Sequence, residues 1–489
     1  MKALLIDFGS TYTKVTLVNL DPPGLIGTAQ APTTVATDLA EGLQQALDEL
    51  APNQLDRVGL TRACSSAAGG LKIVAIGLVP ELTVKAAREA AMGAGGRVLA
   101  AYAHTLSDQE LQEISVIQPD LILLAGGTDG GERRTILENA ARLVDCAIEA
   151  PVVIAGNKAA SDEAADLLQG RVRRVLVTGN VMPEVNVLNV EPARQAIRDL
   201  YLQEITKARG LDRIQQRFGL AMPTPLAVMK AGELLQRTLR QDVVLVDVGG
   251  ATTDIHSFAA GKPARAGCVC KGLPEPFVKR TVEGDLGVRA SALSLLNAVG
   301  AERLMADLAL VDPSLADYGV PDIRDYAAKV FRQKDCLPED RLEQACEGAM
   351  AVACVREALR RHAGWLTESY TPEGCLWVQQ GKDLTGITCL VGTGGVLVHA
   401  GEPSSLLAAG LNQDDPLVLT PRPPHPGFPP GLKECGAQGL QLYLDRHYML
   451  SAIGLLSEIE PEAARVLLED DLEALRDALL RKGCHVAGE

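Results

Sequence analysis

The sequence has very few aromatic residues, so its hydrophobic cores must be built mainly from aliphatic side chains. Phe, Trp and Tyr together make up 3% of the 489 residues, whereas hydrophobic residues of all kinds make up 47%. Cores of Val, Leu, Ile and Ala suit parallel sheets that are covered by helices. The length of the chain predicts about three domains.

Three further features are missing: excess positive charge, long apolar runs and a ligand-like spacing of cysteines. The net charge is −15, and so acidic a chain repels nucleic acid and anionic membranes, so we expect neither as a partner. No apolar run reaches the roughly 18 residues of a membrane span. The 11 cysteines include no CxxC pair, which favours reduced thiols over disulfides or zinc. Because the first predicted strand starts at residue 2, no signal peptide precedes it and we expect a cytoplasmic protein.

The segment 63–182 has the sequence pattern of a parallel sheet with connecting helices. Apolar runs that suit strands alternate there with helical patterns, at about 71–79, 97–102, 121–125, 152–155 and 172–178. Strands that alternate with helices form parallel sheets, so we predict a flavodoxin-like domain. Elsewhere the patterns predict helices at 39–50, 185–214, 224–239, most of 285–380 and 440–480, with a loop at the proline-rich 421–431.

Two short segments share one pattern, an apolar strand that ends in aspartate, a turn of small residues and a second strand. They are Asp7-Phe8-Gly9-Ser10-Thr11-Tyr12-Thr13-Lys14 and Asp247-Val248-Gly249-Gly250-Ala251-Thr252-Thr253-Asp254. Small residues let backbone N–H groups converge on phosphate oxygens, and Lys14 adds a positive charge. Asp7 and Asp247 are suited to hold a hydrated Mg²⁺. Neither segment is a P-loop, because GxxxxGK[ST] does not occur and each turn leads into a strand.

A third glycine-rich loop, Gly392-Thr393-Gly394-Gly395, follows a predicted strand at Cys389–Val391. Glycines at a strand end let the backbone approach a flat ligand, and an adenosine would fit there. A single hairpin or loop of this kind is most often an ordinary turn. Two hairpins separated by a domain-sized segment, and then the third loop, instead favour a nucleotide site.

The sequence thus predicts a catalytic pair that also holds the metal, Asp7 and Asp247. The expected nucleotide-binding residues come from the three motifs: Gly9, Ser10, Thr11, Thr13, Lys14, Gly249, Gly250, Thr252, Thr253, Asp254, Gly392, Thr393, Gly394 and Gly395.

In this order the motifs resemble the phosphate-1, phosphate-2 and adenosine motifs of the actin, hexokinase and heat-shock ATPase superfamily. The segment Thr224–Gly232 also resembles the helix that precedes phosphate-2 in the chaperones. The resemblance implies an α/β fold, with ATP and Mg²⁺ held between two RNase-H-like lobes of the actin-like ATPase type. By it, Asp7 and Asp247 match metal-organising aspartates, Lys14 matches a phosphate-binding lysine, and Asp254 matches the second aspartate of phosphate-2.

One feature of that superfamily is missing. The chaperones carry a glutamate just before the connecting helix, whereas residues 221–224 here are Ala-Met-Pro-Thr. The role of positioning the attacking water is therefore unassigned, and slow hydrolysis is expected. Glu283 and Asp285 are speculative substitutes, and the alternative interpretation is that they belong to a solvated loop.

More narrowly, nearly the whole chain is similar to the glutamate mutase accessory family, called GlmL or MutL and unrelated to DNA mismatch repair. The matching stretches are Ile6–Lys14, Thr61–Gly70, Asp120–Gly131, Asn180–Glu191, Asp242–Asp254 and Glu283–Arg289. The resemblance implies an ATP-binding accessory protein, a reactivating ATPase or chaperone, that serves an adenosylcobalamin-dependent mutase such as glutamate mutase or an aminomutase. A subunit of that mutase is the expected partner. Whether ATP is hydrolysed, as in a slow Mg-ATPase, and the oligomeric state are both left open.

The predicted flavodoxin-like domain is similar to the cobalamin-binding subunit of glutamate mutase, but it lacks a key histidine. In that fold a histidine in the loop after the first strand coordinates the metal, and the corresponding loop here, Val79–Thr83, has none. We therefore do not predict cobalamin bound through a histidine. Either the domain takes the small subunit's place on the mutase, so that damaged cofactor can leave, or it is a divergent insertion without a docking role. His104, at a strand end, is expected to be structural.

The expected domain order follows from these segments. It is a first part of lobe I at 1–62, the inserted domain at 63–182, a return to lobe I with the connecting helix at 183–241, lobe II with a helical insertion at 242–400, and a C-terminal helical region at 401–489. Two other functions stay open. One is a small-molecule kinase or ATP-dependent hydrolase on the same fold, although no dedicated catalytic aspartate is evident. The other is a non-catalytic protein that uses ATP only structurally.

Overall fold

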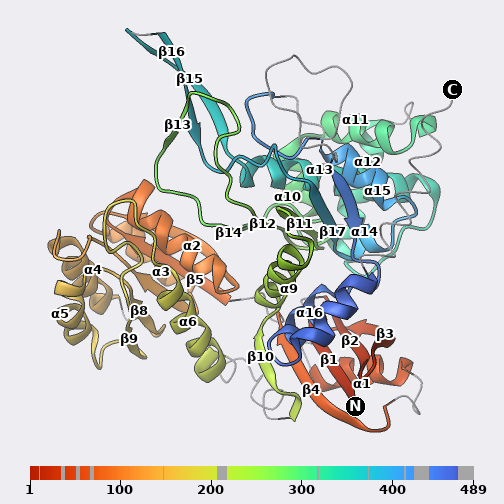
Figure 1. The fold of residues 1–489 in the computed structure, drawn as a ribbon, viewed down its shortest axis with the longest axis horizontal. Coiled ribbons are helices and arrows are strands. Elements are labelled where there is room, and N and C mark those ends of the chain that lie inside the picture. The colour runs from red at the N-terminus through yellow and green to blue at the C-terminus, as the bar shows by residue number, and fades with distance from the viewer. Residues whose placement is uncertain are drawn as a thin grey trace. The chain divides into compact units, whose positions relative to one another are not determined.

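The structure is a computed structural model, shown as a ribbon in Figure 1. It describes residues 1–9, 11–34, 39–50, 55–66, 71–146, 148–205, 217–315, 319–372, 374–411, 415–422 and 440–471. The chain divides into two compact units. The first comprises Met1–Ala231, Gly272–Pro276 and Ser451–Ala464, and the second comprises Gly232–Lys271, Phe277–Leu450 and the residues from Arg465 onward.

The first unit contains a mixed five-stranded sheet in the order β10-β4-β1-β2-β3. Its strands are β1 (Lys2–Phe8), β2 (Tyr12–Leu20), β3 (Pro23–Pro32), β4 (Val58–Ser65) and β10 (Leu220–Pro223). β2 is antiparallel to both of its neighbours, whereas β4 and β10 extend the sheet in parallel from β1. Helix α1 (Leu39–Glu49) buries Leu43 and Ala46 against β1 and β2. This strand order and direction are those of an RNase-H-like lobe.

An all-parallel sheet is inserted in the sequence between β4 and β10, in the order β6-β5-β7-β8-β9 (Figure 1). Its strands are β5 (Leu71–Gly77), β6 (Gly96–Ala103), β7 (Leu121–Leu124), β8 (Val152–Ile154) and β9 (Val175–Val177). When these strands are numbered 1 to 5 along the chain, their order in the sheet is 2-1-3-4-5, which is the flavodoxin-like order. The predicted inserted fold is therefore confirmed.

Alternate residues of β5 face opposite sides of this sheet and enter two cores. Ile73 and Ala75 lie in one core and Val74 and Ile76 in the other. The helices of the first core are α2 (Lys85–Gly93) and α6 (Glu191–Leu200). Those of the second are α3 (Asp108–Ile117), α4 (Arg134–Asp145) and α5 (Lys158–Leu168). Two π-helical turns flank α2 and α6, namely η3 (Pro80–Val84) and η4 (Tyr201–Ile205).

The boundaries of the inserted domain differ from the predicted residues 63 and 182. β4 continues to Ser65 in the first lobe's sheet, and α6 packs on the inserted sheet although it lies in the segment expected to return to lobe I. The predicted helix at 185–214 is also shorter, because α6 begins only at Glu191. Residues 206–214 of that prediction lie outside the described residues.

The second unit repeats the RNase-H-like topology. Its main sheet has the order β14-β12-β11-β17-β18. The strands are β11 (Val243–Val248), β12 (Thr253–Phe258), β14 (Val278–Glu283), β17 (Cys389–Thr393) and β18 (Gln441–Leu444). β12 is antiparallel to β11 and β14, and β17 and β18 run parallel to β11, as in the first lobe. Two lobes of this topology confirm the predicted fold class.

Helices lie before, between and after these strands in the sequence. Between β14 and β17 lie α10 (Ala292–Val299), α11 (Ala301–Val311), the 3-10 turn η5 (Pro313–Leu315), α12 (Val320–Arg332) and α13 (Arg341–His362). Shorter helices follow at α14 (Gly395–Val398), α15 (Pro403–Gly410) and α16 (Leu450–Ser457). Helix α9 (Thr224–Leu239) lies where the sequence predicted a connecting helix, between β10 and β11. In the part of the chain that the structure describes, no helix combines the length and the apolar character that crossing a membrane needs.

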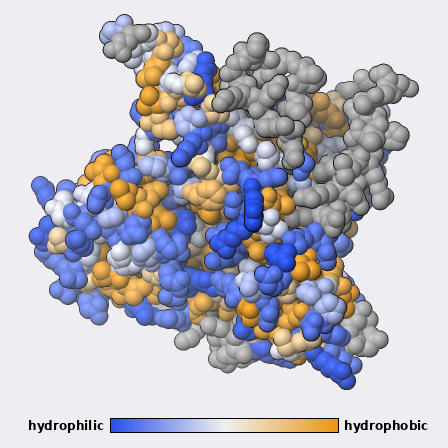
Figure 2. Space-filling model, in the orientation of Figure 1, coloured by the Kyte–Doolittle hydropathy of each residue, from blue (hydrophilic) through white to orange (hydrophobic). Residues whose placement is uncertain are grey.

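Two segments that the sequence predicts as mainly helical, 285–380 and 440–480, do contain helices but also contain strands. A three-stranded sheet of order β13-β16-β15, with β13 (Cys268–Lys271), β15 (Trp365–Thr371) and β16 (Gly374–Gln380), takes up part of the segment 285–380. Most of its residues are exposed, so they show no clean alternation of apolar and polar side chains, and hydrophobic residues reach its surface (Figure 2). The strand β18 lies within 440–480. It is only four residues long, and its pairing with β17 identifies it as a strand.

Candidate functional site

The two predicted motifs are hairpin tips with the same register. Asp7, near the end of β1, pairs directly with Lys14 on β2. Asp247 pairs in the same way with Asp254 across β11 and β12. The hairpins are thus equivalent, except that the position of the lysine in the first is taken by an aspartate in the second. The first hairpin belongs to the first unit and the second hairpin to the second unit.

Each tip is closed by a glycine that follows the first strand. The amide of Gly9 donates to the carbonyl of Tyr12 at 3.0 Å, and the amide of Gly249 donates to the carbonyl of Thr252 at 2.9 Å. A Cβ atom on Gly9 or Gly249 would lie 2.6 or 2.9 Å from that same carbonyl oxygen. Both turns therefore require glycine at this place. Ser10, which the sequence predicts as a ligand, lies outside the described residues.

The carboxylate of Asp7 is held by three neighbours. Its Oδ1 accepts a hydrogen bond from the Thr224 hydroxyl at 2.6 Å and from the Cys64 thiol at 3.6 Å, and its Oδ2 lies 3.8 Å from Lys14 Nζ. Burial, and then the charge of Asp7, raise the pKa of the Cys64 thiol, so it remains a protonated donor. Asp7 is 5% exposed. Its orientation is therefore determined before any ligand binds.

Sequence reasoning did not identify Thr224 and Cys64 as neighbours of Asp7. Thr224 is the first residue of α9, and Cys64 lies opposite Asp7 in the parallel pair of β1 and β4. Both contacts come from residues far away in the sequence, and neither residue belongs to a motif. The only available signal was the predicted helix start at Thr224.

Three of the predicted threonine ligands are buried, with their hydroxyls bonded inside the protein. Thr13 Oγ1 lies 3.1 Å from Thr33 Oγ1, Thr253 donates to the Leu286 carbonyl at 2.8 Å, and Thr393 donates to Asp445 Oδ2 at 2.9 Å. These hydroxyls hold the strands and loops in place. The threonines at the tips differ, because Thr11 is exposed and Thr252 is half-buried.

Asp254 is neutralised within its own sheet. Arg280, on the neighbouring strand β14, donates from Nε and Nη2 to Asp254 Oδ1 at 2.9 and 2.5 Å. Both side chains are almost fully buried, and Thr252 donates to the other carboxylate oxygen of Asp254 at 3.1 Å. Such a charge-assisted pair makes Asp254 a support for the turn rather than a free negative charge.

The backbone of the second turn presents its amides on one side. The carbonyls of Gly249, Gly250 and Ala251 accept from Val288 N at 3.2 Å, Arg289 N at 2.8 Å and Ser291 Oγ at 2.6 Å. In a planar trans peptide the N–H points away from the C=O, so the amides of Gly250, Ala251 and Thr252 point away from these donors. Among the described residues, none of these three amides has a backbone acceptor. They form an arrangement that can bind an anion.

The third motif lies beside the second. β17 runs parallel to β11, and Thr393 pairs with Asp247. Gly394 has φ of +100°, and a Cβ there would lie 2.2 Å from the carbonyl oxygen of Val248. Gly395 then begins α14. The structure therefore brings two of the three predicted motifs together at one edge of the second sheet.

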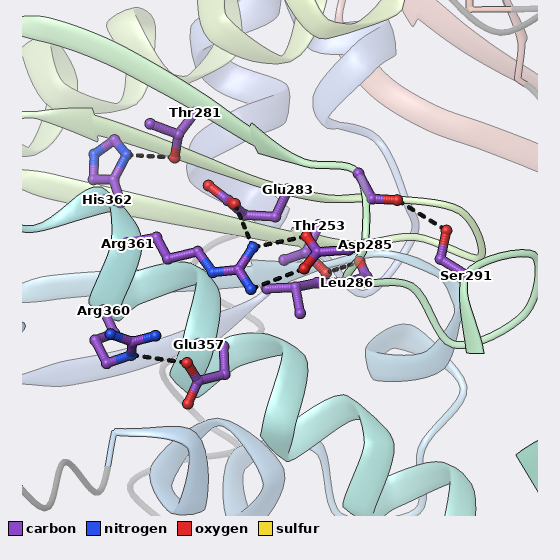
Figure 3. A network of polar contacts seen from close by, with 11 residues as sticks. Thr253, Thr281, Glu283, Asp285, Leu286, Ser291, Glu357, Arg360, Arg361 and His362 are labelled. Atoms are coloured by element: carbon purple, nitrogen blue, oxygen red, sulfur yellow. Dashed lines mark hydrogen bonds and ion pairs between the residues drawn. The ribbon is translucent and has the colours of Figure 1, made fainter. Parts of the chain in front are cut away.

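Glu283 ends β14 and Asp285 lies in the turn after it with its side chain 40% exposed, and both carboxylates are paired (Figure 3). Arg361 of α13 donates from Nη1 to Glu283 at 2.9 Å and to Asp285 at 2.7 Å, and from Nη2 to Asp285 at 2.9 Å. Burial raises the pKa of Glu283, whereas hydrogen bonding to Arg361 lowers the pKa of Asp285. Both carboxylates thus share the guanidinium of Arg361, so neither is an unshared group that could position a water.

The donor set suits a hydrated metal ion better than a protein-enclosed one. Across the described ranges, no three His, Cys, Asp or Glu side chains gather closely enough to hold a metal. Asp247 is half-buried at its strand end and supplies one carboxylate, as Asp7 does in the other hairpin. Mg²⁺ is usually held by one or two carboxylates with several waters and the phosphates of a nucleotide. The residues present fit that mode.

Comparison with known proteins gives matches over nearly the full length. The family model described as "MutL protein" matches residues 3–472. The protein described as "Protein MutL" from Clostridium tetanomorphum is 43% identical over 472 residues, which are 94% of this chain and 97% of that protein.

Solved structures are also similar, at low identity. A nucleotide-free acetone carboxylase aligns with 93% of this chain and 70% of its own chain, at 14% identity and a TM-score of 0.40. The activator of 2-hydroxyisocaproyl-CoA dehydratase from Clostridium difficile, with bound ADPNP, aligns with 98% of each chain at 8% identity and a TM-score of 0.30.

Proposed function

The chain belongs to the MutL protein family, and from this premise we propose that it is an ATP-binding accessory protein of an adenosylcobalamin-dependent mutase, such as glutamate mutase or an aminomutase. The observation that carries the nucleotide part is the second turn. There the amides of Gly250, Ala251 and Thr252 point together, away from the protein donors that hold their carbonyls. Such a nest binds phosphate oxygens even in an acidic chain, because backbone dipoles supply the attraction locally.

The remaining residues of the motifs would complete the site. Asp7 and Asp247 would support a Mg²⁺ through water, and that ion would neutralise phosphate charge. Lys14 would add a positive charge at the first turn, where it lies 3.8 Å from Asp7. At Gly395 nothing lies within 4 Å of the place where a Cβ would stand, so a flat base would find room beside the third motif.

The inserted domain is the proposed contact with the mutase. Its flavodoxin-like strand order supports this role, because it is the fold expected from the resemblance to a cobalamin-binding subunit. In this proposal the domain takes that subunit's place on the mutase while nucleotide is bound, so that damaged cofactor leaves. Binding of ATP then has to change the affinity for the mutase, which is a coupling between two sites.

Nucleotide binding is tested with a fluorescent ATP analogue in the presence of Mg²⁺. Asp247→Asn is expected to weaken binding at least about tenfold, because it removes the charge that supports the metal. Asp48→Asn is the control, since Asp48 is exposed on α1 and accepts a hydrogen bond from Gln44 of the same helix. Wild-type protein that fails to bind Mg-ATP would contradict the nucleotide assignment.

The mutase role is tested by reactivation. A mutase inactivated by turnover should regain activity when this protein and Mg-ATP are added, and it should not with Asp247→Asn. Absence of both reactivation and a complex with the mutase's large subunit, despite ATP binding, would contradict the role. Hydrolysis that depends on an added small molecule would instead favour a kinase or ATP-dependent hydrolase.

A further inference from the structure

One segment forms the back of the second turn. It comprises residues 283–291 and is called here the backing segment. Its donors bond to the carbonyls of Gly249, Gly250 and Ala251, as described above. At Gly287 the two backbones touch, since a Cβ there would lie 2.6 Å from the Ala251 carbonyl carbon and 2.8 Å from the Gly250 oxygen. A shift of the backing segment therefore changes the direction of the three amides of the turn.

Helix α13 holds the backing segment at both ends. Near its start, Arg361 forms a two-pronged pair with Asp285 and a further bond to Glu283 (Figure 3). Near its end, Arg289 forms an ion pair with Glu347 of the same helix. Bidentate arginine–carboxylate pairs fix direction as well as distance, which a single point charge does not.

Arg361 also balances charge behind the turn. Glu283 and Asp285 are two residues apart, and Arg361 is the cation that both of them contact. The side chains of Glu283 and Arg361 are 15% and 30% exposed, so solvent screens this pair only in part. Without the guanidinium, two carboxylates would repel one another close to a turn that is proposed to hold phosphate.

We propose that Arg361 is a positioning residue for the second turn, and that it sets the affinity for the nucleotide without touching it. This inference rests on the proposed function, because the ligand is the nucleotide of that site. It adds a residue that lies in none of the three motifs and acts through Glu283, Asp285 and the backing segment.

The first test measures binding of the fluorescent ATP analogue with Mg²⁺. Arg361→Gln is expected to weaken affinity at least about tenfold. Arg361→Lys is expected to weaken it less, because lysine keeps the positive charge but cannot form the two-pronged hydrogen bonds of the guanidinium. Arg360→Gln is the matched control, since Arg360 precedes Arg361 but donates to Glu357 of its own helix (Figure 3). Wild-type affinity in Arg361→Gln would overturn the proposal.

The second test does not need the nucleotide. Hydrogen exchange of the peptide that carries Gly249–Thr252 is expected to speed up in ligand-free Arg361→Gln and to stay unchanged in Arg360→Gln. Unchanged exchange in Arg361→Gln would overturn the positioning role even if wild type bound no ATP. Altered exchange together with no ATP binding by wild type would leave the positioning of the turn standing and remove only the proposed ligand.

A third variant separates position from charge. Glu283→Gln and Asp285→Asn, added to Arg361→Gln, remove the two carboxylates that repel one another. They do not restore the two-pronged pair between arginine and carboxylate. Affinity is expected to stay low, because the backing segment remains unfixed. Full recovery of affinity in this triple variant would overturn the positioning role, since it would show that charge alone lowers binding.

Discussion

At the scale of single residues, the second lobe buries polar side chains that are bonded to one another. His362 is fully buried, with Nδ1 2.8 Å from Thr281 Oγ1 and Nε2 2.8 Å from Ser257 Oγ. Lys382 is also buried and donates to Ser257 Oγ at 3.0 Å. Buried polar groups persist in proteins when such partners replace water. The network lies beside Arg280 and Asp254, so the same packing also supports the second turn.

Two buried histidines, His256 and His362, should make the stability of the protein depend on pH. Burial, more than neighbouring charge, lowers the pKa of His256 to about 3 and that of His362 well below its ordinary value. The native protein keeps both neutral, whereas the unfolded chain protonates them near pH 6.5. Unfolding then takes up protons, so the free energy of unfolding falls as pH decreases. From pH 7.5 to 6 the loss should be about 1 kcal/mol per histidine.

Denaturant unfolding at these two pH values checks the prediction. The variant His256→Gln with His362→Gln should be less stable at pH 7.5 but lose less stability on acidification. Comparing it with wild type cancels other titrations that the two share. Burial raises the pKa of Asp445 to about 6, so Asp445 begins to take up a proton in the native state within this range and acts in the opposite direction; the two proteins share this titration. Equal pH dependence in the two proteins would contradict the assignment.

At the scale of elements, the third motif depends on how β17 meets β11. Gly394 and Gly395 are adjacent, but only Gly394 has a positive φ and an impossible Cβ position. Around Gly395, no atom lies within 4 Å of the place where a Cβ would stand. Close packing of the loop therefore requires glycine at position 394 but not at position 395, a difference that the sequence alone does not show.

Replacing each glycine by alanine tests this difference. Gly394→Ala should lower the free energy of unfolding by about 2 kcal/mol or more, through backbone strain and a clash with Val248. Gly395→Ala should stay within about 0.5 kcal/mol of wild type. Thermal unfolding measures both, and equal losses in the two variants would show that the close approach to β11 is wrong.

At the scale of the whole molecule, the chain leaves the second unit briefly between β13 and β14. Residues Gly272–Pro276 belong to the first unit, although the strands on either side belong to the second. Leu273 is 3% exposed in the core of the inserted domain, and Glu275 forms an ion pair with Lys85 at 2.5 Å. A short connection between two strands thus supplies an apolar side chain to a domain far away in the sequence.

Truncating that side chain should loosen the inserted domain. Leu273→Ala is expected to cost about 2–5 kcal/mol, because it leaves a cavity among buried aliphatic residues. Val269→Ala, in the neighbouring strand β13, is the control and should change stability by less than about 0.5 kcal/mol, since Val269 is exposed. Hydrogen exchange of residues 71–200 is the measurement. Unchanged protection of that segment in Leu273→Ala would contradict the packing of Leu273.

Much of the fold could be predicted because its signals are local. The helix at 224–239, the helix near 39–50, the parallel inserted sheet and both aspartate-tipped hairpins follow from short-range patterns of apolar, small and polar residues. The sheet of β13, β15 and β16 and the strand β18 could not, because exposed or very short strands carry no such pattern and form only by pairing.

By itself, the sequence determined which residues form the turns, since small residues and a terminal aspartate suffice to make these tips. Only the tertiary structure decided what the side chains do there. The hydroxyls of Thr13, Thr253 and Thr393 form hydrogen bonds inside the protein. Arg280 pairs with Asp254. Arg361 pairs with Glu283 and Asp285. The physical reason is that a hydrogen bond or an ion pair needs its two partners within a few ångströms, and the chain meets that condition by folding distant segments together.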